Sequence, residues 1–227
     1  MTGKLYGVGV GPGDPELLTL KALRLIRECP VVAVPGKEIK ETVAYKIVSQ
    51  AYPELEKKEL AGIHMPMTKD PEKLKESHDA AAARIEDYLR EGKDVAFLTL
   101  GDPTVYSTYL YVHKRVEADG FPAEIVSGIT SFCAVAARMN MGLVEKAEPL
   151  HVIPASYPVE EALQLSGTKV LMKAGKKMGR VKEELLKLDA EVTMIENCGM
   201  EGEACYRSAR EIPEEAGYYS LIIVKEK

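Results

Sequence analysis

The stretch Val95-Ala-Phe-Leu-Thr-Leu-Gly-Asp-Pro103 decides the fold, because it joins a short apolar run directly to a Gly-Asp-Pro loop. An apolar run of this length is typical of a strand buried on both faces of a parallel sheet. A second such loop, Gly13-Asp14-Pro15, follows another predicted strand over residues 4–9. We therefore predict an α/β enzyme whose active site is built on loops at strand ends.

The remainder of the 227-residue chain alternates predicted strands with predicted helices. Asp70 and Gly92 bound the clearest helix, over residues 71–91, and a helix over residues 16–28 follows Asp14 as its N-cap. The polar turn at residues 117–122 is the best domain boundary. We predict two consecutive α/β domains, residues 1–118 and 119–227, with mostly parallel sheets.

Composition limits the class of function. The net charge of −5 argues against a nucleic-acid partner bound by a broad basic face, and we expect none. No apolar run approaches the roughly 20 residues of a membrane helix, so we expect no membrane partner. The four cysteines lack C-x-x-C spacing and the four histidines form no metal motif. We expect free thiols, a cytoplasmic location and no protein-held metal.

Three predicted strand-to-helix loops, residues 9–15, 101–107 and 127–131, could bind a ligand through glycine backbone and helix N-termini. The first loop is not a dinucleotide loop, because Pro12 and Asp14 stand where G-x-G-x-x-G requires glycine. No G-K-[ST] follows it, which excludes a P-loop. Asp102 has two interpretations: a cap of the next helix, or a carboxylate that accepts hydrogen bonds from a ligand.

Two further residue types allow more than one interpretation. His78 lies on the apolar stripe of a predicted helix, which favours a packed core histidine over a ligand-binding one. Met65 and Met67 flank Pro66, and the pattern fits gap-filling core residues and the wall of an apolar substrate pocket equally well.

The loops together resemble the tetrapyrrole methylase family, the class III S-adenosylmethionine-dependent methyltransferases. The matching stretches run nearly the length of the chain and comprise residues 8–22, 98–107, 127–131 and 192–199. The resemblance implies two α/β domains with S-adenosyl-L-methionine in a cleft between them, and a homodimer. Within the family, residues 31–36, 65–70 and 219–224 are most similar to the methyltransferases of cobalamin synthesis that act on C20 of precorrin-2 or cobalt-factor II.

The resemblance also implies site residues. The cofactor-binding positions are Pro12, Leu100, Gly101, Asp102, Val105, Thr130, Ser131, Met172, Lys173, Ala174, Asn197 and Cys198. The substrate-side positions are Gly11, Gly13, Asp14, Pro35, Met65, Met67 and Tyr106. Two positions depart from the family pattern. Ser127 replaces the usual proline of the third loop, and Pro35 stands where uroporphyrinogen-III methylases carry an aspartate. The catalytic base is therefore unassigned.

The reaction implied is attack by a meso carbon of the tetrapyrrole substrate on the sulfonium methyl, followed by proton loss from that carbon. Positioning would be the main catalytic contribution of the protein. Within the family, the alternatives are another corrin-ring position, diphthamide synthesis, and ribosomal RNA ribose methylation, which the acidic pI disfavours. From another class, the alternative is a non-catalytic module that senses S-adenosylmethionine.

Overall fold

The computed structural model describes residues 2–66, 68–154, 157–173 and 177–226. The chain divides into two compact units, residues 1–130 and 131–227. The strands and helices of the first unit are β1 Leu5–Gly9, η1 Pro15–Leu17, α1 Leu20–Glu28, β2 Val31–Pro35, η2 Ile39–Glu41, α2 Val43–Ala51, η3 Pro53–Lys57, β3 Glu59–Ile63, α3 Pro71–Arg90, β4 Val95–Thr99, α4 Tyr109–Ala118 and β5 Ala123–Val126. Those of the second unit are α5 Ser131–Arg138, β6 Leu150–Pro154, α6 Val159–Leu163, β7 Thr168–Met172, α7 Met178–Leu185, β8 Ala190–Glu196, β9 Ala204–Tyr206 and β10 Ser220–Glu226.

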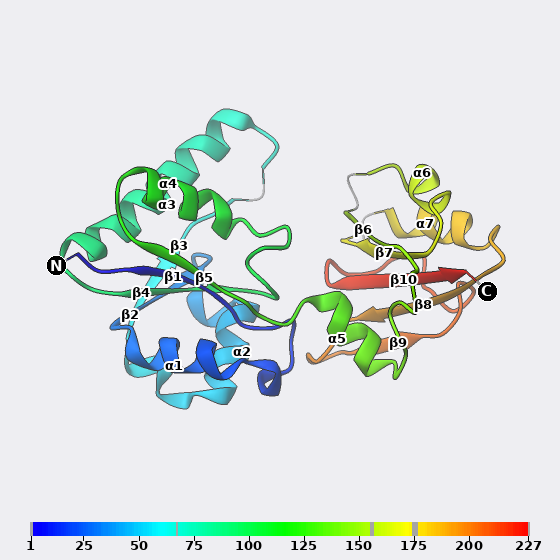
Figure 1. Cartoon of the computed structure of the whole chain (residues 1–227), viewed down its shortest axis with the longest axis horizontal. Helices are drawn as coiled ribbons and strands as arrows, with labels where there is room; N and C mark the ends of the chain where they lie inside the picture. The colour runs from blue at the N-terminus through cyan, green and yellow to red at the C-terminus, as the bar shows by residue number, and fades with distance from the viewer. Residues whose placement is uncertain (1, 67, 155–156, 174–176, 227) are drawn as a thin grey trace. The chain divides into compact units, whose positions relative to one another are not determined.

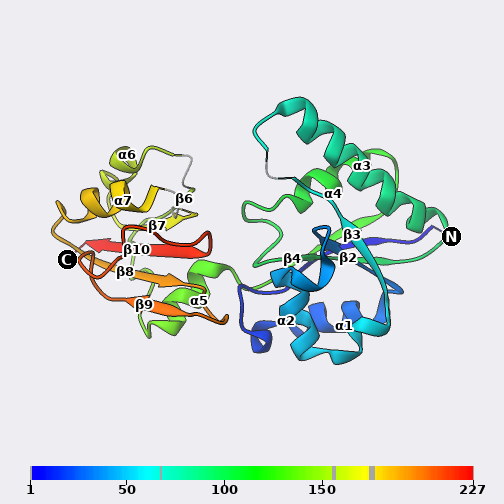
Figure 2. The same ribbon diagram turned by 180° about the vertical axis from the view of Figure 1, so that it is seen from behind.

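The sheet of the first unit is entirely parallel, in the order β3-β2-β4-β1-β5. Helices α1 and α2 cover one face, and α3 and α4 cover the other (Figure 1; Figure 2 shows the same layers from behind). Alternate strand residues supply the two cores: Val8 and Leu98 pack on the α1–α2 side, whereas Leu5 and Phe97 pack on the α3–α4 side. The predicted doubly covered parallel sheet is confirmed here.

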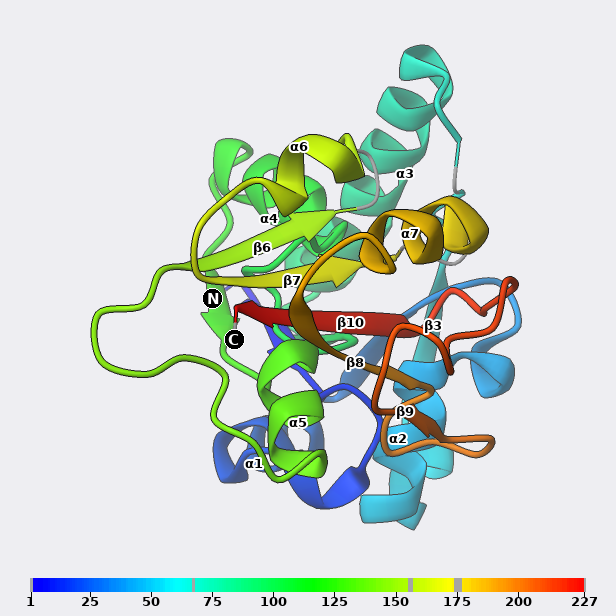
Figure 3. The ribbon, with the colours of Figure 1, turned by 90° about the vertical axis from the view of Figure 1, so that its right-hand side faces the viewer.

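The sheet of the second unit is mixed, in the order β6-β7-β10-β8-β9. Strands β6 and β7 pair in parallel, but β10 is antiparallel to both of its neighbours and β9 is antiparallel to β8. The prediction of mostly parallel pairing is therefore wrong for this sheet. The physical reason is the route of the chain: β10 enters between β7 and β8 from the opposite end. Figure 3 shows α6 and α7 on one face and α5 on the other.

Two local predictions also need correction, and two strands were not predicted. The helix expected over residues 16–28 is two pieces, because Leu18 is extended at ψ 128° and Thr19 caps a new helix by accepting a hydrogen bond from Ala22 N at 3.1 Å. Strands β3 and β9 were not predicted. The units divide after Thr130 rather than at residues 118/119, because β5 pairs with β1 and so completes the first sheet.

Candidate active site

The three predicted loops of the first unit follow β1, β4 and β5, which are neighbours in the parallel sheet. Their carboxyl ends therefore meet at one edge. The first two loops are hydrogen-bonded to each other through an antiparallel bridge: Gly101 N donates to Gly11 O at 2.8 Å, and Gly11 N donates to Gly101 O at 3.3 Å. Both glycines have positive φ, +76° at Gly11 and +72° at Gly101. The two Gly-Asp-Pro loops thus form one structure.

The third loop packs against this bridge through backbone alone. A Cβ atom on Gly9 would lie 2.5 Å from Gly128 N and 2.8 Å from Gly101 O. A Cβ atom on Gly128 would lie 2.8 Å from Gly9 Cα and closer still to Gly101 O. Real Cβ atoms do not approach backbone that closely, so these positions require glycine. The result is close backbone packing of the three loops at the ends of three strands.

Asp102 holds the second and third loops together. The residue is only 7% exposed. Its Oδ1 accepts a hydrogen bond from Thr104 N at 2.7 Å, and its Oδ2 accepts one from Gly128 N at 3.0 Å. The prediction that Asp102 caps the next helix is wrong, because α4 begins at Tyr109 with Thr108 as its N-cap. Asp102 instead closes the turn at Thr104, and its contact with Gly128 links two loops. Both carboxylate oxygens accept hydrogen bonds from the protein, so the main role of Asp102 is to hold the loops of the site in position.

The other first-unit positions proposed for the cofactor lie around these loops. Pro12 is buried, Leu100 and Val105 are half-buried, and Thr130 ends the third loop. The buried Oγ1 of Thr130 has no hydrogen-bond partner among the residues that the structure describes. An unpartnered buried hydroxyl is costly, which makes it a group suited to a ligand. Ser131 begins α5 in the second unit.

In the second unit, the candidate residues gather where β7 and β8 end and β10 begins. Register pairs Met172 with Leu221 and Glu196 with Ser220, so these strand ends share one edge of the sheet. Lys173 follows β7 directly. The Asn197-Cys198 turn follows β8, and Asn197 N donates to Tyr219 O at 3.0 Å. The structure thus brings Met172, Lys173, Asn197 and Cys198 to one edge, whereas Ala174 lies outside the described residues.

Backbone strain marks three of the predicted positions. Tyr106, Lys173 and Asn197 have φ values of +48°, +61° and +54°. Left-handed backbone is uncommon for residues other than glycine, and it concentrates at functional sites. Each of the three residues follows the end of a strand in its own unit, which is where the sequence predicted ligand contacts.

Ser220 is a candidate that the sequence analysis missed. It is 4% exposed at the start of β10, and its Oγ has no hydrogen-bond partner in the described part of the chain. Its place opposite Glu196 puts it at the same edge as Met172 and Asn197. The available signal was weak, because a serine among Leu, Ile and Val at the start of a strand is easily taken for an ordinary boundary residue.

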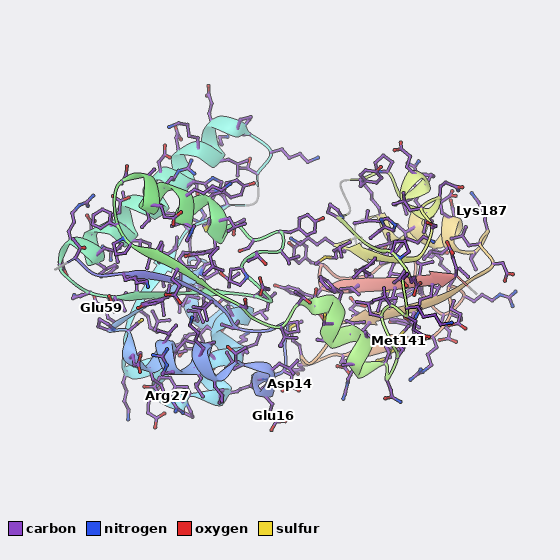
Figure 4. The ribbon with its side chains drawn as sticks, viewed as in Figure 1. Asp14, Glu16, Arg27, Glu59, Met141 and Lys187 are labelled. Atoms are coloured by element: carbon purple, nitrogen blue, oxygen red, sulfur yellow. The ribbon has the colours of Figure 1, made fainter. Side chains whose placement is uncertain are left out.

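The predicted substrate-side residues lie at several strand ends of the first unit. Gly11 and Gly13 are buried in the first loop, and Asp14 accepts a hydrogen bond from Glu16 N at 2.8 Å and so caps η1 (Figure 4). Pro35 ends β2, beside Ile63 at the end of β3. Tyr106 is 49% exposed in the second loop.

The two methionine positions have different outcomes. Met65 is half-buried and packs against the core on the α3–α4 side. Met67 lies outside the described residues.

His78 is a packed residue, as predicted. It is 7% exposed, and its ring stacks on Tyr111 of α4 with centroids 4.5 Å apart. Burial and the nearby Arg115 charge lower the pKa of His78. The described residues hold no group of three or more histidine, cysteine, aspartate or glutamate side chains placed to bind a metal ion.

Comparison with known proteins identifies the family. Residues 4–212 match the model of the Tetrapyrrole (Corrin/Porphyrin) Methylases, which covers most of the chain. The chain belongs to this family. The tetrapyrrole methylase described here is 40% identical to a probable cobalt-precorrin-2 C(20)-methyltransferase of Methanocaldococcus jannaschii, over 75% of this chain and 72% of that protein. It is also 33% identical to the cobalt-precorrin-2 C(20)-methyltransferase of Salmonella typhimurium, over 100% of this chain and 98% of that protein.

A solved structure agrees with the fold of this tetrapyrrole methylase. The uroporphyrin-III C-methyl transferase of Thermus thermophilus, complexed with S-adenyl homocysteine, superimposes with a TM-score of 0.73. The two sequences are 25% identical, and the match covers 99% of this chain and 98% of that one.

Proposed function

We propose that this tetrapyrrole methylase transfers the methyl group of S-adenosyl-L-methionine to C20 of precorrin-2 or cobalt-factor II in cobalamin biosynthesis. The observation that carries the proposal is the full-length similarity to the C20-methyltransferase of Salmonella typhimurium. The S-adenyl homocysteine in the related Thermus thermophilus structure supports the choice of cofactor. Methylation of another corrin-ring position by the same fold is the alternative.

The residues at the two strand-end edges fit this cofactor. In the first unit, Gly9 and Gly128 allow the strand-end loops to pack closely, and Thr130 offers a buried hydroxyl without a partner among the described residues. In the second unit, Ser220 offers another. We propose that Pro12, Leu100, Gly101, Asp102, Val105, Thr130, Ser131, Met172, Lys173, Ala174, Asn197 and Cys198 bind S-adenosylmethionine, and we add Ser220. Asp102 contributes by fixing the loops, since both of its oxygens already accept hydrogen bonds.

For this reaction the protein contributes mainly by positioning the substrate and the cofactor, rather than by supplying reactive side chains. The cofactor supplies an electrophilic methyl when bound, and the nucleophile is a carbon of the substrate. The chain must hold the macrocycle in line and exclude water, a contribution that can amount to several orders of magnitude in rate. We assign the substrate side to Gly11, Gly13, Asp14, Pro35, Met65, Met67 and Tyr106. The group that accepts the proton is unassigned.

For assembly and location, we propose a homodimer in the cytoplasm. None of the four cysteines, all of which the structure describes, forms a disulfide, which suits a reducing compartment. Among the described helices, none is long and apolar enough to cross a membrane.

A direct test uses methyl-labelled S-adenosylmethionine with a reduced tetrapyrrole. Label recovered in the macrocycle supports the enzyme. Tight cofactor binding without transfer to precorrin-2 or cobalt-factor II would instead indicate a sensing module.

A further inference from the structure

A pocket in the second unit lies over the ends of β6 and β7. Its volume is about 330 Å³, which falls within the ~300–1,000 Å³ usual for small-molecule sites. Its apolar lining comes mainly from the core beneath α6 and α7, including Ile153, Leu171 and Val181. Tyr157, which is 46% exposed, contributes an aromatic wall. The pocket therefore combines an apolar floor with an accessible opening.

The charged groups of the pocket favour an anion. Lys177 and Arg180 line it, and Glu160 is the single carboxylate in its described lining. Arg180 Nε donates to Glu160 Oε1 at 2.7 Å, and the side chains of the two residues are 68% and 39% exposed. Exposed ion pairs contribute little stability, so a ligand carboxylate can exchange with Glu160 at small cost. Two cations against one acid give the pocket a positive balance in a chain of net charge −5.

Apart from Met172, the described lining of the pocket shares no residue with the proposed cofactor site on the same sheet. The Met172 and Cys198 side chains pack with the apolar group beneath α5, on one face. Leu171 and Ile153 pack on the other face, beneath α6 and α7. The two regions meet only at the end of β7, where Met172 also lines the pocket. A molecule in the pocket would therefore extend toward the cofactor edge without occupying it.

We propose that this pocket binds one acidic side chain of the tetrapyrrole substrate. Lys177 and Arg180 pair with the carboxylate, and the apolar floor contacts the methylene groups that carry it. Short acidic arms on a flat macrocycle have this combination of an apolar stem and a charged end, which matches a cationic rim above an apolar floor. The inference rests on the proposed function, because it takes a reduced tetrapyrrole as the substrate.

The test compares the double variant Lys177→Gln/Arg180→Gln with the unmodified chain in methyl transfer to cobalt-factor II. Each charge-assisted hydrogen bond contributes about one order of magnitude in binding affinity. We therefore expect the KM for the macrocycle to rise roughly 10–100-fold in the double variant. We expect kcat to change by less than about twofold, because binding is lost without loss of transition-state contacts. S-adenosylmethionine affinity, measured by calorimetry, should be unchanged. Arg180→Lys alone should cost less than Arg180→Gln.

Lys187→Gln is the matched control. Lys187 follows the end of α7 and pairs with Glu184, so Lys187→Gln removes one positive charge that does not line the pocket, against two removed in the double variant (Figure 4). An unchanged macrocycle KM in the double variant, or a rise equal to that of Lys187→Gln, overturns the pocket assignment and leaves the proposed function intact. Weakened S-adenosylmethionine binding also overturns it, by assigning the pocket to the cofactor. No transfer by the unmodified chain overturns both.

Discussion

Gly128 offers the sharpest test of how the three strand-end loops pack. In Gly128→Ala, the new methyl would lie 2.8 Å from Gly9 Cα and nearer still to Gly101 O. Both neighbours are backbone within hydrogen-bonded loops, so neither can rotate away. Gly128 is not among the positive-φ residues, so the cost is steric alone. Overpacking costs about 1–3 kcal/mol, and the rigid surroundings place this variant near the upper figure, at about 3 kcal/mol.

Gly142→Ala is the matched control, because its methyl would meet only the Glu145 side chain at 3.9 Å and no positive φ is involved. We expect it to stay within about 0.5 kcal/mol of the unmodified chain. The assay is urea unfolding of both variants, with hydrogen exchange at the β1, β4 and β5 amides to report on the first unit. A Gly128→Ala protein as stable as Gly142→Ala would refute the close packing of these loops.

Two further predictions concern charge and cofactor affinity. Asp102→Ala leaves Gly128 N and Thr104 N without their acceptor. Calorimetry should show that this variant binds S-adenosylmethionine about tenfold or more weakly, and that Asp102→Asn loses less affinity. Unchanged affinity in Asp102→Ala would remove Asp102 from the site. Hydrogen bonds from Lys21 and Lys4 lower the pKa of Glu124 to about 2. Because that pKa is depressed in the folded state, the stabilisation is present above the usual glutamate pKa and is lost as the pH falls toward 2. Glu124→Gln should therefore reduce stability at pH 7 and have a smaller effect near pH 2. An equal loss of stability at both pH values would contradict the pairing of Glu124 with Lys4 and Lys21.

Local signals predicted the first unit well. The run ending in Gly101-Asp102-Pro103 has the continuous apolar character of a buried parallel strand, and β4 is that strand. Asp70 caps α3 as predicted, by accepting hydrogen bonds from Glu72 N and Lys73 N. These features depend on neighbouring residues in the sequence, so the sequence was sufficient to find them.

The errors arose where distant segments decide the structure. Strand β3 is an edge strand with exposed Glu59 and Gly62, and β9 has three residues, so neither shows a clear apolar period. The direction of β10 depends on where the chain re-enters the sheet, which no local pattern records. Ser220 became a candidate only when the structure showed its hydroxyl to be buried and without a partner among the described residues.

The proposed reaction places one methyl group on one carbon of the macrocycle. The most direct measurement incubates the protein with S-adenosylmethionine carrying a ¹³C-methyl group and with precorrin-2 or cobalt-factor II, and then locates the label by NMR. We predict one labelled methyl, on C20 of the macrocycle. A label on any other ring position, or an unlabelled macrocycle beside cofactor-saturated protein, would contradict it.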